Sequence, residues 1–268
     1  MSHYLKKWPQ HLGELNGPHH NSYDFFIGSL TGFLSGFLGV GGGFILVPLL
    51  IFAGVPAHTA IGSSLAYIIF TGISGAIQHY KQKNCDFKLV LLLICGGVVT
   101  AQIGAAMTLY IEGRALEMLL GFLLLGTAIR MLTQKDGRSK SSNIAKMSIR
   151  YKIPVAIAIG SVTGFLSGLV GVGGGFLLVP LMILLLHEPI HKAVGTSLIG
   201  VVGFATSGVI RHWMIGHIDS SLVGILVAGG IFLAPLGAKA SKKTSRQLLR
   251  KIFSALLLLF SLKLLIQI

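Results

Sequence analysis

Charged residues are scarce in this sequence. Only 11% of its 268 residues are Asp, Glu, Lys or Arg, eight are acidic, and 53% are hydrophobic, with a mean hydropathy of +0.79. Soluble domains carry about 25% charged residues, so this composition excludes a soluble protein and indicates an integral membrane protein. Apolar runs of a length suited to crossing a bilayer cover residues 24–53, 57–79, 88–111, 115–132, 153–186, 190–210, 220–238 and 247–268.

Other absences narrow the class of protein further. The alternation of apolar and polar residues that marks membrane strands is missing, so the spans are expected to be helices. Cys85 and Cys95, the only cysteines, do not make a disulfide framework. Paired carboxylates, metal-ligand spacings and phosphate-binding GK[ST] motifs are also missing. We therefore expect no enzyme activity, no metal and no cofactor.

A glycine-rich apolar segment occurs twice. GFLSGFLGVGGGFILVP (32–48) and GFLSGLVGVGGGFLLVP (164–180) are identical at 14 of 17 positions, at an offset of 132. Beyond them the similarity continues after one inserted residue, and the matches include Pro56 with Pro189, Ser64 with Ser197, His79 with His212, and Asp86 with Asp219. The chain is therefore expected to be a duplication of one membrane unit.

The duplication divides the chain into four expected parts. These are a polar N-terminal tail (1–23), a first membrane repeat (24–132), a basic cytoplasmic linker (133–152) and a second membrane repeat (153–268). The tail lacks the continuous apolar region of a cleavable signal peptide. The predicted fold is an all-α polytopic membrane protein with two homologous, inverted repeats, each consisting of a glycine-broken first helix or hairpin and three further transmembrane helices.

The net charge of +14 comes from short loops between apolar segments, and no basic, aromatic-interleaved surface suited to nucleic acid is present. Lys and Arg are enriched in cytoplasmic loops. If each glycine-rich segment crosses the membrane once, the repeats are parallel and at best 14 of the 22 Lys and Arg lie inside. If each segment is a hairpin, the repeats are inverted and 17 lie inside, with the N-terminus outside.

Segment length also favours hairpins. As single helices, 24–53 and 153–186 would each extend roughly 45–50 Å, too long for one ordinary span and too short for two. A long tilted helix whose glycines serve close packing is the alternative. Pro48 and Pro180 are expected in the first turn of the helix that restarts after the glycines, where a missing N–H costs nothing.

The duplicated pattern resembles a known family. Both copies contain GVGGG, then four residues and a Pro, then a PxHxAxGxS segment and a histidine before a polar loop. This pattern is similar to the sulfite exporter TauE/SafE family of membrane transporters. The resemblance extends from about Phe25 to Leu265. It implies a multi-pass protein of the bacterial plasma (inner) membrane that moves small sulfur-containing anions, such as sulfite, sulfonates or thiosulfate, or related organic acids.

The residues themselves indicate an anion but not its identity. Unwound backbone inside a membrane protein is tolerated where it lines a cavity or is buried, and transporters built from inverted repeats bind substrate at such breaks. A helix that restarts after glycines offers free N–H groups and a positive dipole end to a small oxyanion. The substrate-binding residues expected there are Gly41, Gly42, Gly43, Gly173, Gly174 and Gly175.

Hydroxyl groups occupy matching places in the next helix of each repeat, at Ser63, Ser64, Thr196 and Ser197. Uncharged donors can bind a sulfonate or sulfite without the cost of a buried lysine, although such hydroxyls also cap helices or bond their own backbone. We include them in the expected substrate site. His79 and His212 end the second helix of each repeat and are candidates for a proton relay.

The expected function is secondary transport of a small anion by alternating access at a site between the repeats. The alternative is an anion channel lined by the same half-helix termini. The expected partners are the anion and the lipid bilayer, with protons or sodium as candidate coupling ions and no nucleic acid. The sequence leaves open the particular anion, the direction of transport and whether the chain forms a homo-oligomer.

Overall fold

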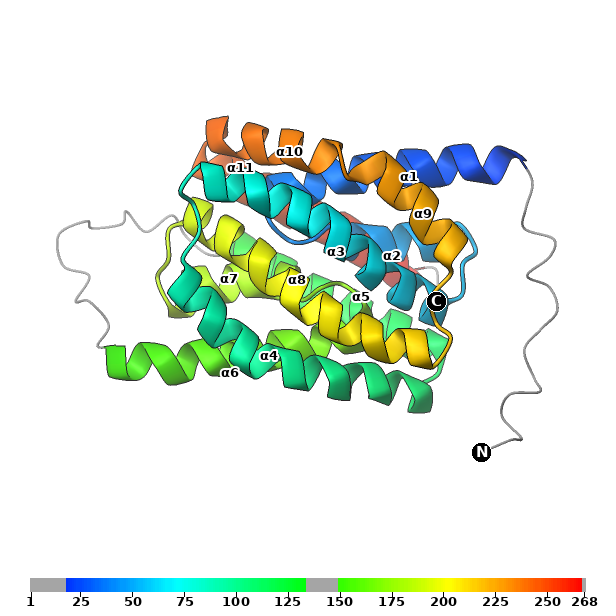
Figure 1. Cartoon of the computed structure of the whole chain (residues 1–268), viewed down its shortest axis with the longest axis horizontal. Coiled ribbons are helices and arrows are strands. Elements are labelled where there is room, and N and C mark those ends of the chain that lie inside the picture. The colour runs from blue at the N-terminus through cyan, green and yellow to red at the C-terminus, as the bar shows by residue number, and fades with distance from the viewer. Residues whose placement is uncertain (1–17, 134–148, 267–268) are drawn as a thin grey trace.

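A computed structural model describes residues 18–133 and 149–266 of the protein, and every regular element in these ranges is helical (Figure 1). The helices of the first half are α1 (Pro18–Leu38), α2 (Gly43–Phe52), α3 (Ala57–Lys81), α4 (Phe87–Met107), the short 3₁₀ helix η2 (Thr108–Tyr110) and α5 (Gly113–Thr133). Those of the second half are α6 (Ile149–Val170), α7 (Gly175–Leu185), α8 (Ile190–Met214), α9 (Ser220–Gly230), α10 (Leu233–Lys243) and α11 (Arg246–Ile266).

The helices confirm an all-α, multi-pass membrane protein. Within the described ranges, five helical stretches are long and apolar enough to cross a membrane: α3, α4 with η2, α5, residues 151–170 of α6, and α8. The bent pair α9 and α10 makes a sixth if counted as one span, whereas α2 and α7 are shorter apolar helices. The predicted tail and linker fall mostly on residues 1–17 and 134–148, which lie outside the described ranges. However, α1 already begins at Pro18 and α6 at Ile149.

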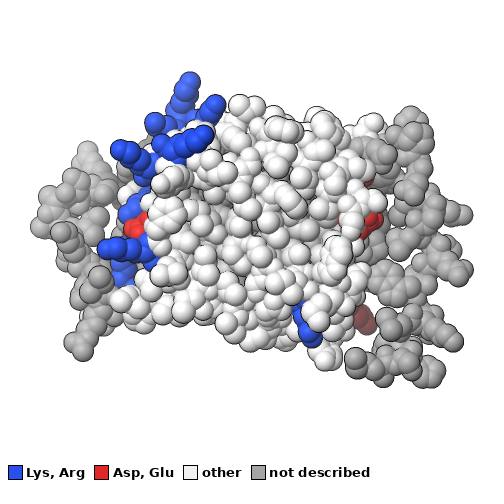
Figure 2. All heavy atoms as spheres, viewed as in Figure 1, with Lys and Arg blue, Asp and Glu red and all other residues white. Residues whose placement is uncertain are grey.

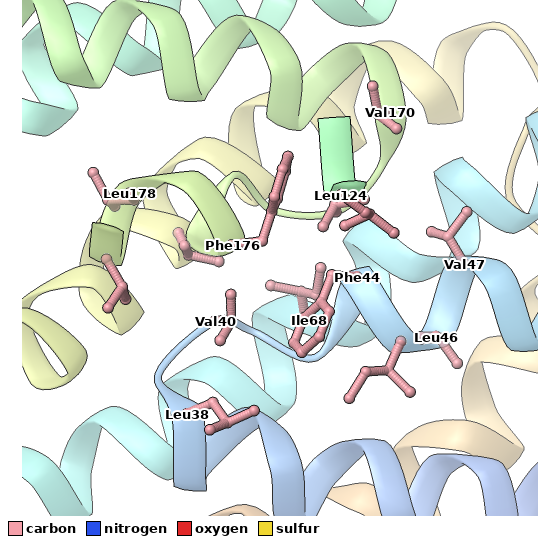
Figure 3. Packing of buried hydrophobic residues seen from close by; sticks show 14 of the residues in the cluster. Leu38, Val40, Phe44, Leu46, Val47, Ile68, Leu124, Val170, Phe176 and Leu178 are labelled. Atoms are coloured by element: carbon pink, nitrogen blue, oxygen red, sulfur yellow. The ribbon is translucent and has the colours of Figure 1, made fainter. Parts of the chain in front are cut away.

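Each glycine-rich segment folds back on itself (Figure 3). The helix α1 reaches Leu38 from the same side toward which α2 departs, and α6 and α7 are arranged in the same way around the second loop. A Cβ atom added at Gly42 would lie 2.9 Å from the carbonyl oxygen of Thr31, two turns before the end of α1. The start of α2 therefore lies beside the middle of α1. Each segment is a helical hairpin, and a single long tilted helix is excluded.

The backbone at the loops explains the glycines. Gly42 and Gly174 precede α2 and α7 with φ angles of +81° and +72°, in the left-handed region that costs other residues about 1–2 kcal/mol. The expectation for the prolines is wrong, because Pro48 and Pro180 are each the sixth residue of their helix rather than part of its first turn. A proline there has no N–H to pair with the carbonyl four residues earlier.

Glycines spaced four residues apart bring helix backbones into direct contact. On α1, a Cβ at Gly28, Gly32 or Gly36 would collide with the backbone of Leu226, Gly230 or Ala234 in α9 and α10. On α6, a Cβ at Gly160, Gly164 or Gly168 would collide with the backbone of Leu93, Gly97 or Ala101 in α4. Small residues at such spacing are how helices approach closely in lipid. These two glycine seams fix the hairpins against the rest of the bundle.

The helix that includes α9 and α10 is bent by 44°. Pro235 is the third residue of α10 and lacks the N–H that would pair with the carbonyl of Ile231. Ser74 of α3 donates a hydrogen bond to that carbonyl at 2.7 Å. At the matching place in α4 stands Gln102, whose amide donates to the carbonyl of Ser207 in α8 at 2.6 Å.

Nearly all the Lys and Arg side chains visible in Figure 2 gather at one end of the molecule. The ends of α3 and α10 and the starts of α6 and α8 lie at this end, which we call the basic end (Figure 1). The opposite end carries η2 and the start of α9. Because Lys and Arg are enriched on the cytoplasmic side of membrane proteins, the basic end is expected to face the cytoplasm.

The close contacts along the glycine seams predict that a larger side chain at a seam glycine destabilises the fold. Gly164→Leu should lower the melting temperature in detergent by roughly 5–10 °C or prevent folding, since its Cβ would lie 2.5 Å from the Cα of Gly97. Gly224→Leu is the matched control, because a Cβ added there meets nothing within 4 Å. Melting temperatures read by size-exclusion chromatography check this, and equal values for the two variants would contradict the packing described.

The charge distribution predicts the orientation of the chain in the membrane. On a background with Cys85 and Cys95 replaced by Ser, Tyr110→Cys should react with an impermeant maleimide added to intact cells, because this residue is 87% exposed at the end opposite to the basic end. Thr244→Cys, between α10 and α11, should react only after the cells are permeabilised. The reverse pattern would contradict a cytoplasmic basic end.

Candidate functional site

The two glycine loops, 39–42 and 171–174, meet in the middle of the molecule. In Figure 3, Val40 and Phe44 of the first hairpin lie close to Phe176 of the second. A Cβ at Gly43 would lie 2.8 Å from the Cα of Val172, and a Cβ at Gly175 would lie 2.6 Å from the Cα of Val40. The start of each short helix therefore abuts the loop of the other half.

Backbone N–H groups at these loops have no partner within the described residues. In α2 the first intrahelical bonds are donated by Ile45 and Leu46 to the carbonyl of Gly42, and the N–H groups of residues 41–43 donate to no acceptor. In α7 the carbonyl of Gly174 accepts from Leu177 and Leu178, and the N–H groups of residues 173–175 are likewise unpaired. All six glycines are buried.

The structure thus brings together the six glycines expected to bind substrate. Both α2 and α7 begin at the central loops, so the positive ends of two helix dipoles point toward the middle of the protein. Unpaired N–H groups at a helix start are a site for a small anion. Binding of an anion by these glycines stays a prediction.

Two of the four hydroxyls expected to bind substrate form hydrogen bonds between the two halves of the chain. Ser64 Oγ donates to the carbonyl oxygen of Gly171 at 2.8 Å, and Ser197 Oγ donates to that of Gly39 at 2.6 Å. Each serine therefore holds the first residue of the opposite loop. In this arrangement both hydroxyl protons are taken by protein, and contact with a ligand stays a prediction.

The other two hydroxyls contact the starts of helices in the opposite half. Ser63 Oγ accepts from the N–H of Asp219, and Thr196 Oγ1 accepts from the N–H of Asp86, each at 3.0 Å. The carboxylates of these two aspartates cap α9 and α4. Ser63 and Thr196 therefore anchor the helix starts, and a role in binding substrate stays a prediction for them too.

The two candidate relay histidines are buried near the ends of α3 and α8, and each contacts a glycine about one turn before a loop. His79 Nε2 donates to the carbonyl of Gly36 at 2.8 Å, and His212 Nε2 donates to that of Gly168 at 2.9 Å. His79 Nδ1 has no partner in the described residues. Each histidine thus links the end of a long spanning helix to the hairpin of its own half. Proton transfer through them stays a prediction.

Two further histidines, His58 and His217, lie near His212 and were not among the candidate functional residues predicted from the sequence. The Nδ1 atoms of His212 and His217 are 3.3 Å apart, and the rings of His58 and His217 are 5.0 Å apart. His58 Nε2 also approaches the carbonyls of Thr108 and Ile111 at 3.1 Å. The sequence signal was weak because the residue that matches His217 in the first repeat is Asn84.

The basic end carries ion pairs. Lys192 bonds Asp86 at 2.8 Å and Lys152 bonds Glu188 at 2.6 Å. Although burial opposes the shift, the hydrogen bond from Lys192 lowers the pKa of the Asp86 carboxyl. The pair between Asp86 and Lys192 joins the two halves of the chain at the basic end. The described residues contain no group of three or more His, Cys, Asp or Glu able to hold a metal ion.

Residues 25–264 match the family described as sulfite exporter TauE/SafE. The chain belongs to the sulfite exporter TauE/SafE family. No solved structure matches it.

Relatives of this TauE/SafE protein carry the name probable membrane transporter protein. YunE of Bacillus subtilis is 30% identical over 89% of this chain and 94% of its own length. YdhB of the same organism is 32% identical over 78% and 86%. A relative from Methanocaldococcus jannaschii is 30% identical over 86% and 90%. These names indicate a membrane transporter rather than an enzyme, and the protein is a multi-pass protein of the plasma membrane.

The histidine cluster predicts a dependence of stability on pH. His217 lies between α8 and α9. Burial lowers its pKa from 6.5 to about 4, and repulsion from the nearby His212 and His58 adds to this effect. Between these values the unfolded chain is protonated at this imidazole and the folded protein is not, so stability should fall as the pH drops from 6.5 toward 4. Replacing His217 by Asn, the residue at the matching position 84, removes this loss.

The measurement is the melting temperature in detergent at pH 7.5 and pH 5. The decrease between these two conditions should be smaller in His217→Asn than in wild type by roughly 2–4 °C. His187→Asn is the control, because His187 is exposed and lies outside the cluster. Equal decreases in wild type and His217→Asn would show that the cluster does not contribute.

Proposed function

We propose that this protein is a secondary transporter that moves a small oxyanion of the sulfite, sulfonate or thiosulfate class, or a related organic anion, across the plasma membrane. The anion binds at Gly41–Gly43 and Gly173–Gly175. The observation that carries the proposal is the set of unpaired N–H groups at the starts of α2 and α7, buried where the two hairpins meet. Unpaired buried N–H groups cost about 1–3 kcal/mol each, and an oxyanion would satisfy several at once.

We further propose that the two halves are inverted repeats with the site between them. Supporting this, α1 runs toward the basic end while α6 runs away from it (Figure 1). The hydrogen bonds of Ser64 to Gly171 and of Ser197 to Gly39 are reciprocal between the halves. Transporters with this symmetry rock one half against the other around a central site.

Close packing of the loops supports transport by alternating access rather than flow through an open channel. With Val40 against Gly175 and Val172 against Gly43, the loops must separate before an anion reaches the N–H groups. Separation breaks the hydrogen bonds that Ser64 and Ser197 make to the loops, and we propose that these hydroxyls then face the anion, with Ser63 and Thr196 beside them. His79 and His212 would relay protons if protons are the coupling ion.

Counterflow tests this function. Purified protein in liposomes loaded with one anion should accumulate the same labelled anion from outside, with sulfite, thiosulfate, sulfoacetate and isethionate as the panel. A transporter shows saturable counterflow, whereas a channel passes ions faster without it. Uptake of none of the panel would contradict the substrate class, and rapid flux without counterflow would favour the channel.

Glycine variants test the position of the site in the same assay. Gly42→Ala and Gly174→Ala should reduce counterflow at least tenfold, because a Cβ would crowd the loop and strain its positive φ angle. Gly54→Ala is the matched control, since Gly54 has a φ of +88° but a Cβ there meets nothing within 4 Å. Normal transport by both loop variants would place the site elsewhere.

A further inference from the structure

Two buried serines beside the glycine loops have no hydrogen-bond partner within the described residues. They are Ser35 of α1 and Ser167 of α6, each 0% exposed. They occupy identical places in the repeated segment GFLSG. Neither belongs to the set of hydroxyls expected from the sequence to bind substrate.

Their unpaired state is unusual for their helices. A hydroxyl in a helix ordinarily donates to the carbonyl four residues earlier. Thr31 and Thr163, one turn before the two serines, do so at 2.7 Å. Ser35 and Ser167 leave that bond unmade, although burial of an unpaired hydroxyl is unfavourable. Because the hydroxyls at both matching positions lack this bond, we expect the two serines to share a function.

The position of the serines connects them to the unpaired N–H groups. The carbonyl of Ser35 accepts from the N–H of Gly39, and that of Ser167 accepts from Gly171, both at 2.9 Å, so each serine is in the turn that leads into its loop. A Cβ at Gly42 would lie 3.2 Å from the Cβ of Ser35. Ser35 therefore lies on the inner side of the first hairpin, against the start of α2.

We propose that Ser35 and Ser167 bind the transported anion directly, each donating its hydroxyl proton to an oxygen of the anion while the N–H groups of its own hairpin bind the other oxygens. This proposal rests on the function proposed above. Unlike Ser64 and Ser197, these two hydroxyls need no hydrogen bond to be broken before they bind. A hydroxyl donor suits a small oxyanion at this depth because it avoids burying a lysine.

The test is isothermal titration of purified wild type, Ser35→Ala and Ser167→Ala with sulfite and, in parallel, with sulfoacetate. Each variant should bind with roughly 5- to 30-fold higher Kd, the loss expected for one hydrogen bond to an anion. Without anion, their melting temperatures should match wild type, because no bond within the protein is removed. Ser241→Ala is the matched control, since Ser241 of α10 is also 0% exposed and unpaired and lies at the basic end; its Kd should be unchanged.

The possible outcomes are distinguishable. Wild-type binding with unchanged affinity in both alanine variants overturns the role of Ser35 and Ser167 and leaves the proposed function standing. Failure of wild type to bind either anion overturns the proposed function and the serine role together. If the alanine variants are unstable without anion, Ser35→Cys and Ser167→Cys, which nearly keep the side-chain volume but donate weakly, make the same test. Wild-type affinity in those variants would show that the serines are structural.

Discussion

Direct contact between glycines and the backbones of neighbouring helices is the constraint on which the rest of this structure depends. In lipid no hydrophobic force drives helices together, so close packing and backbone proximity must hold them. The seams along α1 and α6 bring the two hairpins against α9, α10 and α4 without intervening side chains. That placement keeps the loops 39–42 and 171–174 deep in the bundle, where the starts of α2 and α7 come together.

The centre of the bundle combines apolar side chains with polar backbone groups and a few buried hydroxyls. The side chains of Ile68 and Val201 pack against both Gly41 and Gly173. The donors in this region are main-chain N–H groups and hydroxyls. The anion site that we propose there would attract a negative charge through dipoles rather than through an opposite charge, so it would release the ligand without separating a strong ion pair. Moderate affinity of this kind would suit the proposed transporter, which must release its substrate on the far side of the membrane.

Much of the architecture was predictable from the sequence because it depends on local chemistry. Apolar run lengths predicted the helices, and the GVGGG motif predicted the breaks, since only glycine adopts positive φ freely. Pro48 was misplaced because the end of the loop depends on how the hairpin packs, not on the proline itself. The site was predicted in part. The six glycines do converge, but the contacts of Ser64 and Ser197 cross between halves and depend on tertiary structure.

The sequence could not reveal that the hydroxyls of Ser35 and Ser167 lack a hydrogen-bond partner. Ser35 is a serine in an apolar helix, and such residues usually bond their own backbone. Only the three-dimensional arrangement shows that it does not. The cluster around His217 was hidden for a different reason, because the matching position in the first half holds Asn84 instead of a histidine.

The crossed bonds of Ser64 and Ser197 have a consequence for biosynthesis. The first half of the chain leaves the ribosome before α8 has been made, so the carbonyl of Gly39 has no serine to accept from at that stage. Domains synthesised first generally fold first, but here the first hairpin cannot complete its contacts alone. Its final docking must wait until the second half has entered the membrane, which makes closure of the centre one of the last steps in assembly.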